Sequence, residues 1–301
     1  MTDNMRPRRS LLFMPGVNAR ALAKARELPA DGLIFDLEDA VAPAAKGEAR
    51  AAVGTALAAG GYGRRELVVR VNGLDTPWGR DDLAAAARCG CDAVLLPKVE
   101  SGASVRRTLD LLEEFAAPDN LEIWCMLETP RGILRAEEIA TASTRVAALV
   151  MGTSDLTKEL RARHTPDRRP LLASLGHCLL VARAYGLTAL DGVHLDLHDD
   201  TGFAAACRQG VDLGFDGKTL IHPKTIAVAN SLFAPDAAAL AWARKVITVH
   251  SAAMERGEGI VVVDGQLIEN LHVDDARRLV ALAAAISALE AANLPAPNGG
   301  H

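Results

Sequence analysis

A single carboxylate stands at the end of one of the most apolar stretches of the chain. In "IWCMLETPRG", Glu128 follows the apolar run Ile123–Leu127 and precedes a Thr-Pro turn. A short continuous apolar run of this kind predicts a β-strand that is buried on both faces. Because burying an unpaired carboxylate costs several kcal/mol, Glu128 needs a bound cation or a charged partner at the end of that strand.

Other apolar runs also end in polar residues. These are Asp36, Glu38, Asp39, Arg70, Asn72, Lys98, Glu100, Asp155 and His222. Any one of them could cap a helix or a turn, and Asp155 in "GTSDL" has the helix N-cap as its alternative role. The repetition of polar strand ends, with both signs of charge, favours one common site over a series of unrelated caps.

Two of these carboxylates, Glu128 and Asp155, predict a magnesium site, which Mn²⁺ could also occupy. Mg²⁺ is usually held by a few protein carboxylates, with water and substrate oxygens completing the coordination. An ion with open positions can chelate a 2-oxo or 2-hydroxy carboxylate and polarise its oxygen. Arg70 would supply a planar fork for the substrate carboxylate. The residue types therefore predict metal-assisted chemistry on a small oxo or hydroxy acid.

Eight apolar runs alternate with helical segments, and they are the elements that must position these side chains. The predicted strands are Leu11–Met14, Leu33–Leu37, Leu67–Val71, Ala93–Pro97, Ile123–Leu127, Ala147–Met151, Leu187–Leu190 and Gly217–Ile221. This alternation is typical of parallel strands joined by crossover helices, and eight such units predict an α/β fold, a TIM (β/α)₈ barrel. A doubly wound sheet is the alternative, but no G-x-G-x-x-G follows the first run. Active sites of TIM barrels lie where the carboxyl ends of the strands meet.

The character of the chain changes after Pro223. A helical segment, Asp236–Met254, leads to "GIVVVDGQLIEN", whose alternation around a Gly turn predicts a small hairpin, and a final helix follows over Val273–Ala291. We therefore predict a catalytic barrel over residues 1–230 and a small C-terminal lid or oligomerisation extension over residues 231–301. The extension is too small to bury a core alone, so we expect it to dock on its own barrel or on that of a neighbour.

Composition excludes several other functions. The chain has 301 residues and a formal net charge of -5, which gives no basic field for nucleic acid. No run reaches 18 uninterrupted apolar residues, so we expect no membrane partner and a cytoplasmic protein. The five cysteines lack zinc-site spacing. In "HLDLHDD", His194, Asp196 and His198 would share one face of a strand as metal ligands might.

Seven motifs in order carry a resemblance to a known family. They are "RSLLFMPGVNAR", "DGLIFDLEDAVAPAAK", "VVRVNGLDTPW", "VLLPKVES", "MLETPRG", "MGTSDLTKELRA" and "FDGKTLIHPKTI". Together they resemble the citrate lyase β-subunit-like group of the HpcH/HpaI aldolase family, which includes malyl-CoA and citramalyl-CoA lyases. The resemblance implies a TIM barrel, dependence on Mg²⁺, a CoA thioester substrate and reversible cleavage to acetyl-CoA and a 2-oxo acid. It also implies a homotrimer or hexamer whose lids reach neighbouring active sites.

The resemblance also implies roles for individual residues. Glu128 and Asp155 fall on the family's metal ligands, and Arg70 falls on its substrate-binding arginine. Arg20 and Lys24 lie in the segment that matches the CoA-contacting loop, although a lysine and an arginine four apart on a helix are otherwise usually solvated.

The remaining acidic positions have less direct counterparts in the family. Glu38 and Asp39 match an acidic pair near the metal, which would hold its waters. The family's lid aspartate, which acts as acid or base, is replaced here by Glu269, and the alternative for Glu269 is an ordinary surface glutamate. Tyr and Asp often replace the histidines of "HLDLHDD" in the family, which argues against a metal site there.

The expected activity is therefore cleavage of a malyl-CoA or citramalyl-CoA type thioester. Arg70, Glu38 and Glu269 are the expected catalytic residues, and Arg70, Glu128, Arg20 and Lys24 the expected substrate contacts. Three alternatives remain open: an acyl-CoA thioesterase, a citryl-carrier-protein lyase subunit of a citrate lyase complex, and a non-catalytic binding module.

Overall fold

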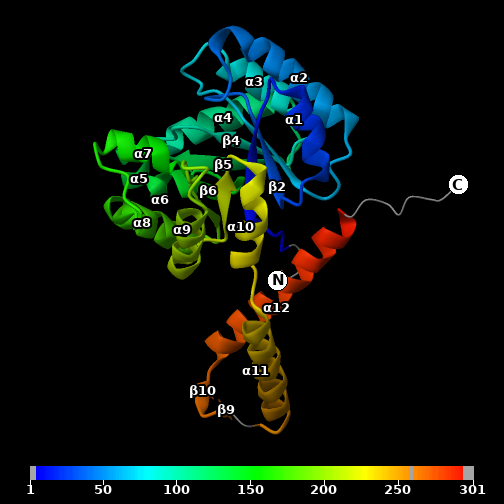
Figure 1. The fold of residues 1–301 in the computed structure, drawn as a ribbon, viewed down its shortest axis with the longest axis vertical. Helices are drawn as coiled ribbons and strands as arrows, with labels where there is room; N and C mark the ends of the chain where they lie inside the picture. The colour runs from blue at the N-terminus through cyan, green and yellow to red at the C-terminus, as the bar shows by residue number, and fades with distance from the viewer. Residues whose placement is uncertain (1–4, 258–259, 294–301) are drawn as a thin grey trace, which may run out of the picture. The chain divides into compact units, whose positions relative to one another are not determined.

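The computed structural model describes residues 5–257 and 260–293, and its main feature is a closed barrel of eight parallel strands (Figure 1). Neighbours in sequence pair in order around the barrel, and β1 closes it by pairing with β8. The strands are β1 (Ser10–Pro15), β2 (Gly32–Asp36), β3 (Glu66–Arg70), β4 (Ala93–Leu96), β5 (Glu122–Leu127), β6 (Val146–Met151), β7 (Thr188–Asp191) and β8 (Gly217–Leu220). All carboxyl ends of parallel strands meet at one mouth of such a barrel.

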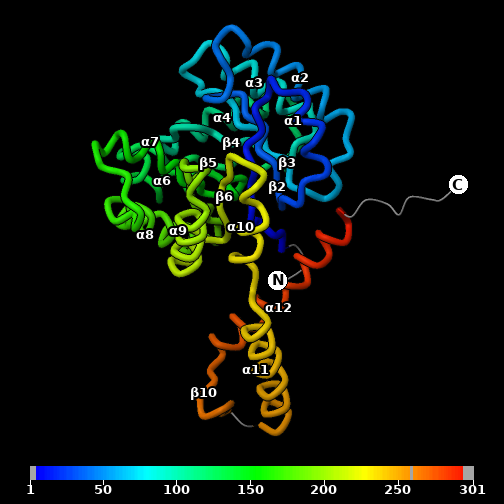
Figure 2. The backbone as a smooth tube through the Cα atoms, viewed as in Figure 1, coloured from blue at the N-terminus to red at the C-terminus, as the bar shows by residue number. Residues whose placement is uncertain are grey.

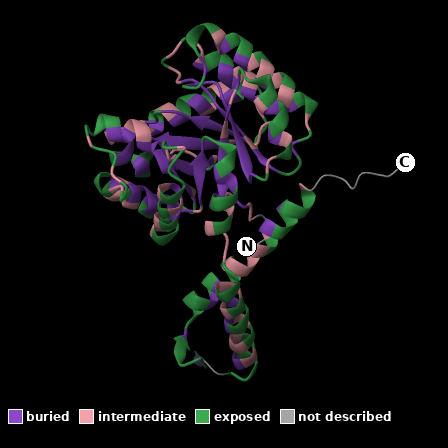
Figure 3. Ribbon diagram, in the orientation of Figure 1, coloured by how far each residue is buried: buried purple, intermediate pink, exposed green. Residues whose placement is uncertain are grey.

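The strands are apolar throughout because they are covered on both faces, by helices outside and by one another inside. Figure 3 shows them as the buried centre of this unit. The barrel interior contains an apolar cluster, in which Trp124 and Met126 of β5 lie among residues from six other strands, β1–β4, β6 and β7. At the amino-terminal end of the strands, Arg8 lies 5.0 Å above the Trp124 ring and forms an ion pair with Glu66 at 2.7 Å. The interior is therefore a packed core, with room for a site only at the mouth.

Helices follow the strands and lie outside them, as the trace in Figure 2 shows. They are α1 (Ala19–Lys24), α2 (Lys46–Ala59), α3 (Gly79–Ala86), α4 (Gly102–Glu114), α5 (Pro130–Leu134), α6 (Ala136–Ala140), α7 (Thr153–Glu159), α8 (Leu172–Ala184), α9 (Asp200–Leu213) and α10 (Ile226–Leu232). In α4, the Ser101 side chain accepts the Ser104 N–H as an N-cap, and Val105 and Leu112 lie buried on one face.

The chain divides into two compact units at Asn230 and Ser231. The smaller unit contains α11 (Ala237–Glu255), the hairpin β9 (Val261–Val263) and β10 (Gln266–Ile268), and α12 (Asn270–Ala292), together with the described residues before Arg8. It has its own apolar cluster, in which α11 and α12 pack against the inward side chains of the hairpin.

One helical stretch, Pro223–Glu255, has the length and apolar composition of a membrane span. The chain leaves helical geometry between α10 and α11, which cuts this stretch into two shorter helices. The buried residues of α11 pack in the cluster of the smaller unit. The buried share of the apolar window is 22%, so packing within the described chain accounts for part of its apolar composition.

The predicted barrel is confirmed, and the helix, hairpin and final helix after residue 231 are present. Strand bounds differ from the predicted ones by at most one residue. The fourth strand ends at Leu96 and not at Pro97, because Pro97 has no N–H for the ladder. The last helix begins at Asn270, three residues earlier than predicted. The lid role of the smaller unit stays a prediction.

Candidate active site

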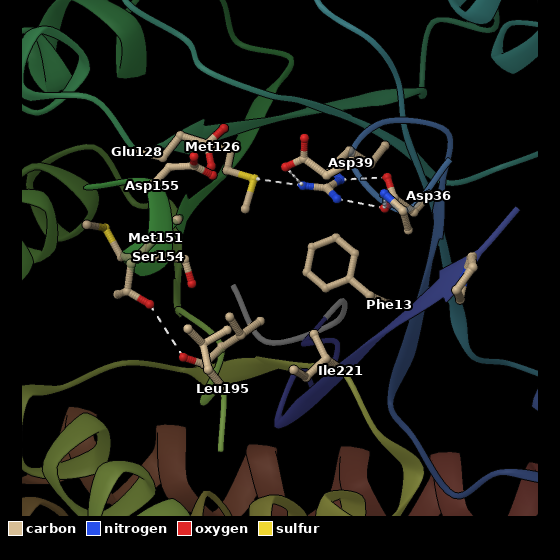
Figure 4. A pocket seen from close by; sticks show the side chains of 16 residues that line it. Phe13, Asp36, Asp39, Met126, Glu128, Met151, Ser154, Asp155, Leu195 and Ile221 are labelled. Carbon is tan, nitrogen blue, oxygen red and sulfur yellow. Dashed lines mark hydrogen bonds and ion pairs between the residues drawn. The ribbon is translucent and has the colours of Figure 1, made fainter. Parts of the chain in front are cut away.

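A cavity of about 410 Å³ lies at the carboxyl ends of the barrel strands (Figure 4). Its polar lining consists of Asp36, Asp39, Arg70, Thr153, Ser154, Glu128 and Asp155. Its apolar lining includes Phe13, Met126, Met151, Val193, Leu195 and Ile221. Residues from seven of the eight strand ends and their following loops thus meet in one place, as parallel strand topology predicts.

Glu128 is a deeply buried carboxylate of this cavity, with 1 % of its surface exposed. It follows β5 directly, and its Oε1 accepts the main-chain N–H of Lys98 at 2.8 Å. Burial raises the pKa of Glu128 to about 7, against the opposing charge and N–H of Lys98, and the charge of Asp155 raises it further. The ionised form of Glu128 is therefore destabilised by burial and by the charge of Asp155, and a bound cation would stabilise it.

Asp155 supplies the second carboxylate of the predicted metal pair. It lies in the first turn of α7 and lines the same cavity as Glu128, and its charge acts on Glu128. Figure 4 shows the two side chains next to each other on one side of the cavity. The N-cap of α7 is Gly152, so Asp155 does not have the capping role that was its alternative.

Two carboxylates with open space around them fit a hard divalent ion that keeps water or substrate oxygens. Over residues 5–257 and 260–293, no group of three or more His, Cys, Asp or Glu side chains is arranged to hold a metal. A closed structural metal site is therefore absent from this part of the chain. Glu128 and Asp155 are the residues that could hold an ion with open coordination positions.

Gly152 allows this pair to come together. A Cβ added at Gly152 would lie 2.3 Å from Oε2 and 2.4 Å from Cβ of Glu128, closer than van der Waals contact permits. The turn between β6 and α7 thus passes directly over the Glu128 side chain, and only glycine leaves room for it.

Gly152→Ala is therefore expected to displace Glu128 and to lower the free energy of unfolding by about 1–3 kcal/mol. Gly176→Ala is the matched control, because Gly176 lies inside α8 with no atom within 4 Å of the added Cβ. The control should gain about 0.5–1 kcal/mol. Denaturant unfolding of both variants measures the difference, and equal effects would contradict the close approach at Gly152.

Arg70 ends β3 and is buried next to two carboxylates. Its Nε and Nη2 each donate to an Asp36 oxygen at 2.7 Å, and its Nη1 lies 3.1 Å from Oε2 of Glu38. Burial lowers its pKa, but the hydrogen bonds and charges of Asp36 and Glu38 outweigh this and raise it, so the guanidinium stays charged. Phe13 packs against the guanidinium at 4.7 Å. Each guanidinium nitrogen thus already has an acidic partner, and a substrate carboxylate can use only the N–H groups of Nη1 and Nη2 that these partners leave over.

Glu38 and Asp39 differ in position. Asp39 lines the cavity, whereas Glu38 is absent from its lining and forms an ion pair with Arg70. Nζ of Lys98 donates to Oε1 of Glu38 at 2.6 Å. Burial lowers the pKa of Lys98, but Glu38, Glu128 and Asp39 outweigh this and raise it. The catalytic role predicted for Glu38 stays a prediction, and its contacts are those of a residue that positions Arg70.

Several residues of the site had no assigned role from the sequence. Asp36 and Lys98 were recognised only as polar strand ends, and their contacts with Arg70 and Glu128 come from neighbouring strands. Phe13, Met126 and Met151 form much of the apolar wall. In the sequence they are ordinary members of apolar runs, so no local signal distinguishes them from core residues.

Three other predicted residues are not among those that line this cavity. Arg20 and Lys24 are exposed on α1, one turn apart, as predicted. Glu269 belongs to the smaller unit, where it is the exposed N-cap residue of α12, and its N–H donates to Nδ1 of His272. The assigned roles of all three stay predictions.

The strand that would have aligned His194, Asp196 and His198 is not formed. β7 ends at Asp191, and these three residues lie in the following loop. Nε2 of His194 is buried without a hydrogen bond and lies 3.9 Å from Asp199. The metal-binding alternative for this segment therefore loses its geometric basis.

Comparison with known proteins places this site in a family. Residues 9–223 match the model described as "HpcH/HpaI aldolase/citrate lyase". The chain is 48% identical over 291 residues to a protein named (3S)-malyl-CoA thioesterase from Cereibacter sphaeroides strain KD131, covering 97% of this chain and 100% of that protein. It is 37% identical to citrate lyase subunit beta of Escherichia coli K12, covering 92% of this chain and 94% of the relative.

A solved structure agrees with these sequence matches. The crystal structure of CitE from Mycobacterium tuberculosis, in complex with magnesium, acetoacetate and coenzyme A, superposes with a TM-score of 0.74 at 31% identity. The match covers 91% of this chain and 97% of that one. The barrel, the carboxylate pair and these matches agree, and the chain belongs to the HpcH/HpaI aldolase/citrate lyase family.

Proposed function

We propose that this protein is a Mg²⁺-dependent lyase that cleaves a 3-hydroxyacyl-CoA of the malyl-CoA or citramalyl-CoA type into acetyl-CoA and a 2-oxo acid. The observation that carries the proposal is the cavity at the barrel mouth, where Glu128 and Asp155 face a charged Arg70. The CitE structure, described as a complex with magnesium, acetoacetate and coenzyme A, supports the same ligand classes here.

The charges around the cavity fit a divalent cation. The acidic side chains in and beside it are Asp36, Glu38, Asp39, Glu128 and Asp155, and the basic ones are Arg70 and Lys98. Ionised, they carry an excess of negative charge that would repel an anionic thioester. When bound, Mg²⁺ supplies positive charge and a Lewis acid that polarises the substrate oxygens. Glu128 and Asp155 would hold it.

Arg70 would bind the carboxylate of the 3-hydroxyacyl group through the N–H groups that Asp36 and Glu38 leave over. Its fixed position between Asp36 and Phe13 means that little reorganisation is needed when negative charge develops on the departing oxo acid. The hydroxyl group loses its proton to a base, and the electron pair of the breaking C–C bond passes to the thioester fragment. Protonation of that carbanion gives acetyl-CoA, and Glu269 of the lid is the proposed proton donor.

Thioester hydrolysis is the second candidate. The observation that favours it is the 48% identity, over nearly the whole chain, to a protein named (3S)-malyl-CoA thioesterase. Hydrolysis would break the C–S bond and give malate and free CoA. The same carboxylate pair and arginine could bind the same substrate, so residue types do not separate the two reactions.

The products decide between the candidates. The purified chain is incubated with Mg²⁺ and (3S)-malyl-CoA in ¹⁸O-water, and the products are identified by mass. The lyase reaction yields acetyl-CoA and glyoxylate, and it also runs in reverse from these two compounds. Hydrolysis yields CoA and malate carrying one ¹⁸O in a carboxylate. Products of hydrolysis alone would overturn the lyase proposal, and no turnover of any CoA ester would favour a carrier-protein substrate.

The predicted lid exchange between subunits has its own test. Glu269→Gln is expected to lower kcat by about 10²–10⁴-fold, because it removes the proposed proton donor. Glu128→Gln should inactivate the barrel site because it removes a proposed Mg²⁺ ligand. If each site combines one chain's barrel with a neighbour's lid, co-expression of the two variants should restore roughly a quarter of wild-type activity through mixed oligomers. Absence of recovery in isolated mixed oligomers would show that each chain completes its own site.

A further inference from the structure

The chain departs from regular strand geometry where β4 meets the candidate site. Leu96 is the last residue of β4 to pair with β5, opposite Cys125. The next contact is from the Val99 N–H to the Met126 carbonyl at 3.2 Å. In a parallel ladder this bond aligns Val99 with Leu127, so Pro97 and Lys98 together lie opposite Met126 and β4 carries one extra residue here. Pro97 has no N–H, and the Lys98 N–H donates elsewhere, so the interruption leaves no donor unused.

Lys98 has a left-handed backbone conformation, with φ of 48°. A residue with a Cβ adopts this conformation at an energetic cost, and such residues are concentrated at functional sites where the surrounding structure holds them. Here the conformation directs the Lys98 N–H to Oε1 of Glu128 at 2.8 Å. The main chain of Lys98 thus orients one of the two carboxylates proposed to bind Mg²⁺.

The side chain of Lys98 acts on the other half of the site. Its Nζ donates to Oε1 of Glu38 at 2.6 Å, and Oε2 of Glu38 lies 3.1 Å from Nη1 of Arg70. Neither Lys98 nor Glu38 lines the cavity, so neither is placed to contact a bound substrate. Lys98 and Glu38 thus form a chain of contacts that connects Glu128 to Arg70.

We propose that Lys98 is a positioning residue that couples the metal-binding and substrate-binding halves of the site. It orients Glu128 through its main-chain N–H and Arg70 through the Glu38 carboxylate. The inference rests on the proposed function, because it assigns Glu128 to the metal and Arg70 to the substrate. Without the ammonium group, Glu38 loses the partner of one oxygen, and its charge competes with Asp36 for the Arg70 guanidinium.

If Lys98 had a purely structural role, its removal would lower the melting temperature and leave kcat unchanged. The positioning role predicts the opposite. Nearly half of the Lys98 side chain is exposed, with a relative exposure of 45%. Ion pairs with such exposure contribute little to stability. Removing the ammonium group should therefore change the melting temperature little. A misplacement of about 1 Å in a substrate-positioning group, in contrast, lowers rates by about a hundredfold.

The experiment compares Lys98→Met, Lys98→Arg, Glu38→Gln and the double variant Lys98→Met/Glu38→Gln. Lys98→Met is expected to lower kcat about 30- to 100-fold. Its Mg²⁺ affinity, measured by calorimetry with the metal alone, should stay within about threefold of wild type, because the main-chain N–H remains. Lys98→Arg should recover most of kcat, and the double variant should be no slower than the worse single variant.

Lys158→Met is the matched control, since Lys158 is an exposed lysine of α7 outside the cavity lining. It should behave as wild type. Wild-type kcat in Lys98→Met would overturn the proposal. So would losses in kcat that multiply in the double variant, because they would show that Lys98 and Glu38 act independently and not through their shared ion pair.

The backbone part of the inference is tested without activity. Lys98→Gly should melt at a higher temperature than Lys98→Ala, because glycine adopts the left-handed conformation without strain. Equal melting temperatures would contradict it. If the wild-type protein neither cleaves nor hydrolyses a CoA ester, the proposed function fails. Crystal structures would then still test the coupling: displacement of the Arg70 guanidinium from Asp36 in Lys98→Met but not in Lys158→Met would support it, and an unmoved Arg70 would overturn it.

Discussion

Replacing Glu128 with glutamine is expected to lower kcat/KM for the CoA ester by at least about 10³-fold, because it removes one of the two carboxylates that bind Mg²⁺. Glutamine has nearly the same shape, and its carbonyl oxygen can still accept the Lys98 N–H. The loss should therefore come from the missing charge and not from misfolding. Calorimetry with Mg²⁺ should show a parallel loss of metal affinity.

The same substitution is expected to stabilise the metal-free protein above pH 7. Burial raises the pKa of Glu128 from 4.5 to about 7, so the folded protein holds this proton more tightly than the unfolded chain. Stability from this group is complete below pH 4.5 and is lost as the pH rises to 7. At pH 8 the ionised carboxylate costs roughly 2–3 kcal/mol, which glutamine removes. At pH 4.5 the melting temperatures should converge.

Glu100→Gln is the matched control for Glu128→Gln. Glu100 lies at the neighbouring strand end and is absent from the cavity lining. It should leave activity, Mg²⁺ affinity and the pH dependence of stability unchanged. A Glu128→Gln variant with undiminished Mg²⁺-dependent turnover would overturn the assignment of the metal site and the proposed function with it.

Replacing Arg70 with methionine is expected to be the most damaging change to both activity and stability. Arg70 is 7% exposed and pairs with Asp36, which is 1% exposed. Removing it leaves buried carboxylates without a counter-charge, which costs about 3–5 kcal/mol. Activity should fall by at least about 10³-fold, because the group that binds the substrate carboxylate is lost. Denaturant unfolding and steady-state kinetics measure the two losses.

Two further variants separate charge from geometry at Arg70. Arg70→Lys keeps the positive charge but cannot contact both oxygens of Asp36 with a planar fork. It should retain most of the stability and still lose about a hundredfold in kcat/KM. Asp36→Asn combined with Arg70→Met should recover stability but not activity. Near-wild-type kcat/KM in Arg70→Lys would show that charge alone suffices. Arg80→Met, which removes an exposed ion pair with Glu114, is the control.

Much of the fold follows from local sequence patterns. Continuous apolar runs predict buried parallel strands, and the spacing of eight such runs predicts the closed barrel. Glu128 and Asp155 could be identified as a pair because topology alone brings the ends of adjacent parallel strands together. The helix–hairpin–helix arrangement after residue 231 follows from its own periodicity and its Gly turn.

The tertiary structure determined which of these charged side chains pair with one another. The sequence predicts a planar fork at Arg70 for a substrate carboxylate, but Asp36 pairs with Nε and Nη2 of this fork, and Glu38 pairs with Nη1. Lys98 carries an unremarkable sequence signal, and its importance depends on a left-handed backbone turn and on partners about thirty and sixty residues away. Sequence patterns report strand periodicity and residue type, whereas pairing among several charges depends on side-chain distances and burial, which arise only when the barrel closes.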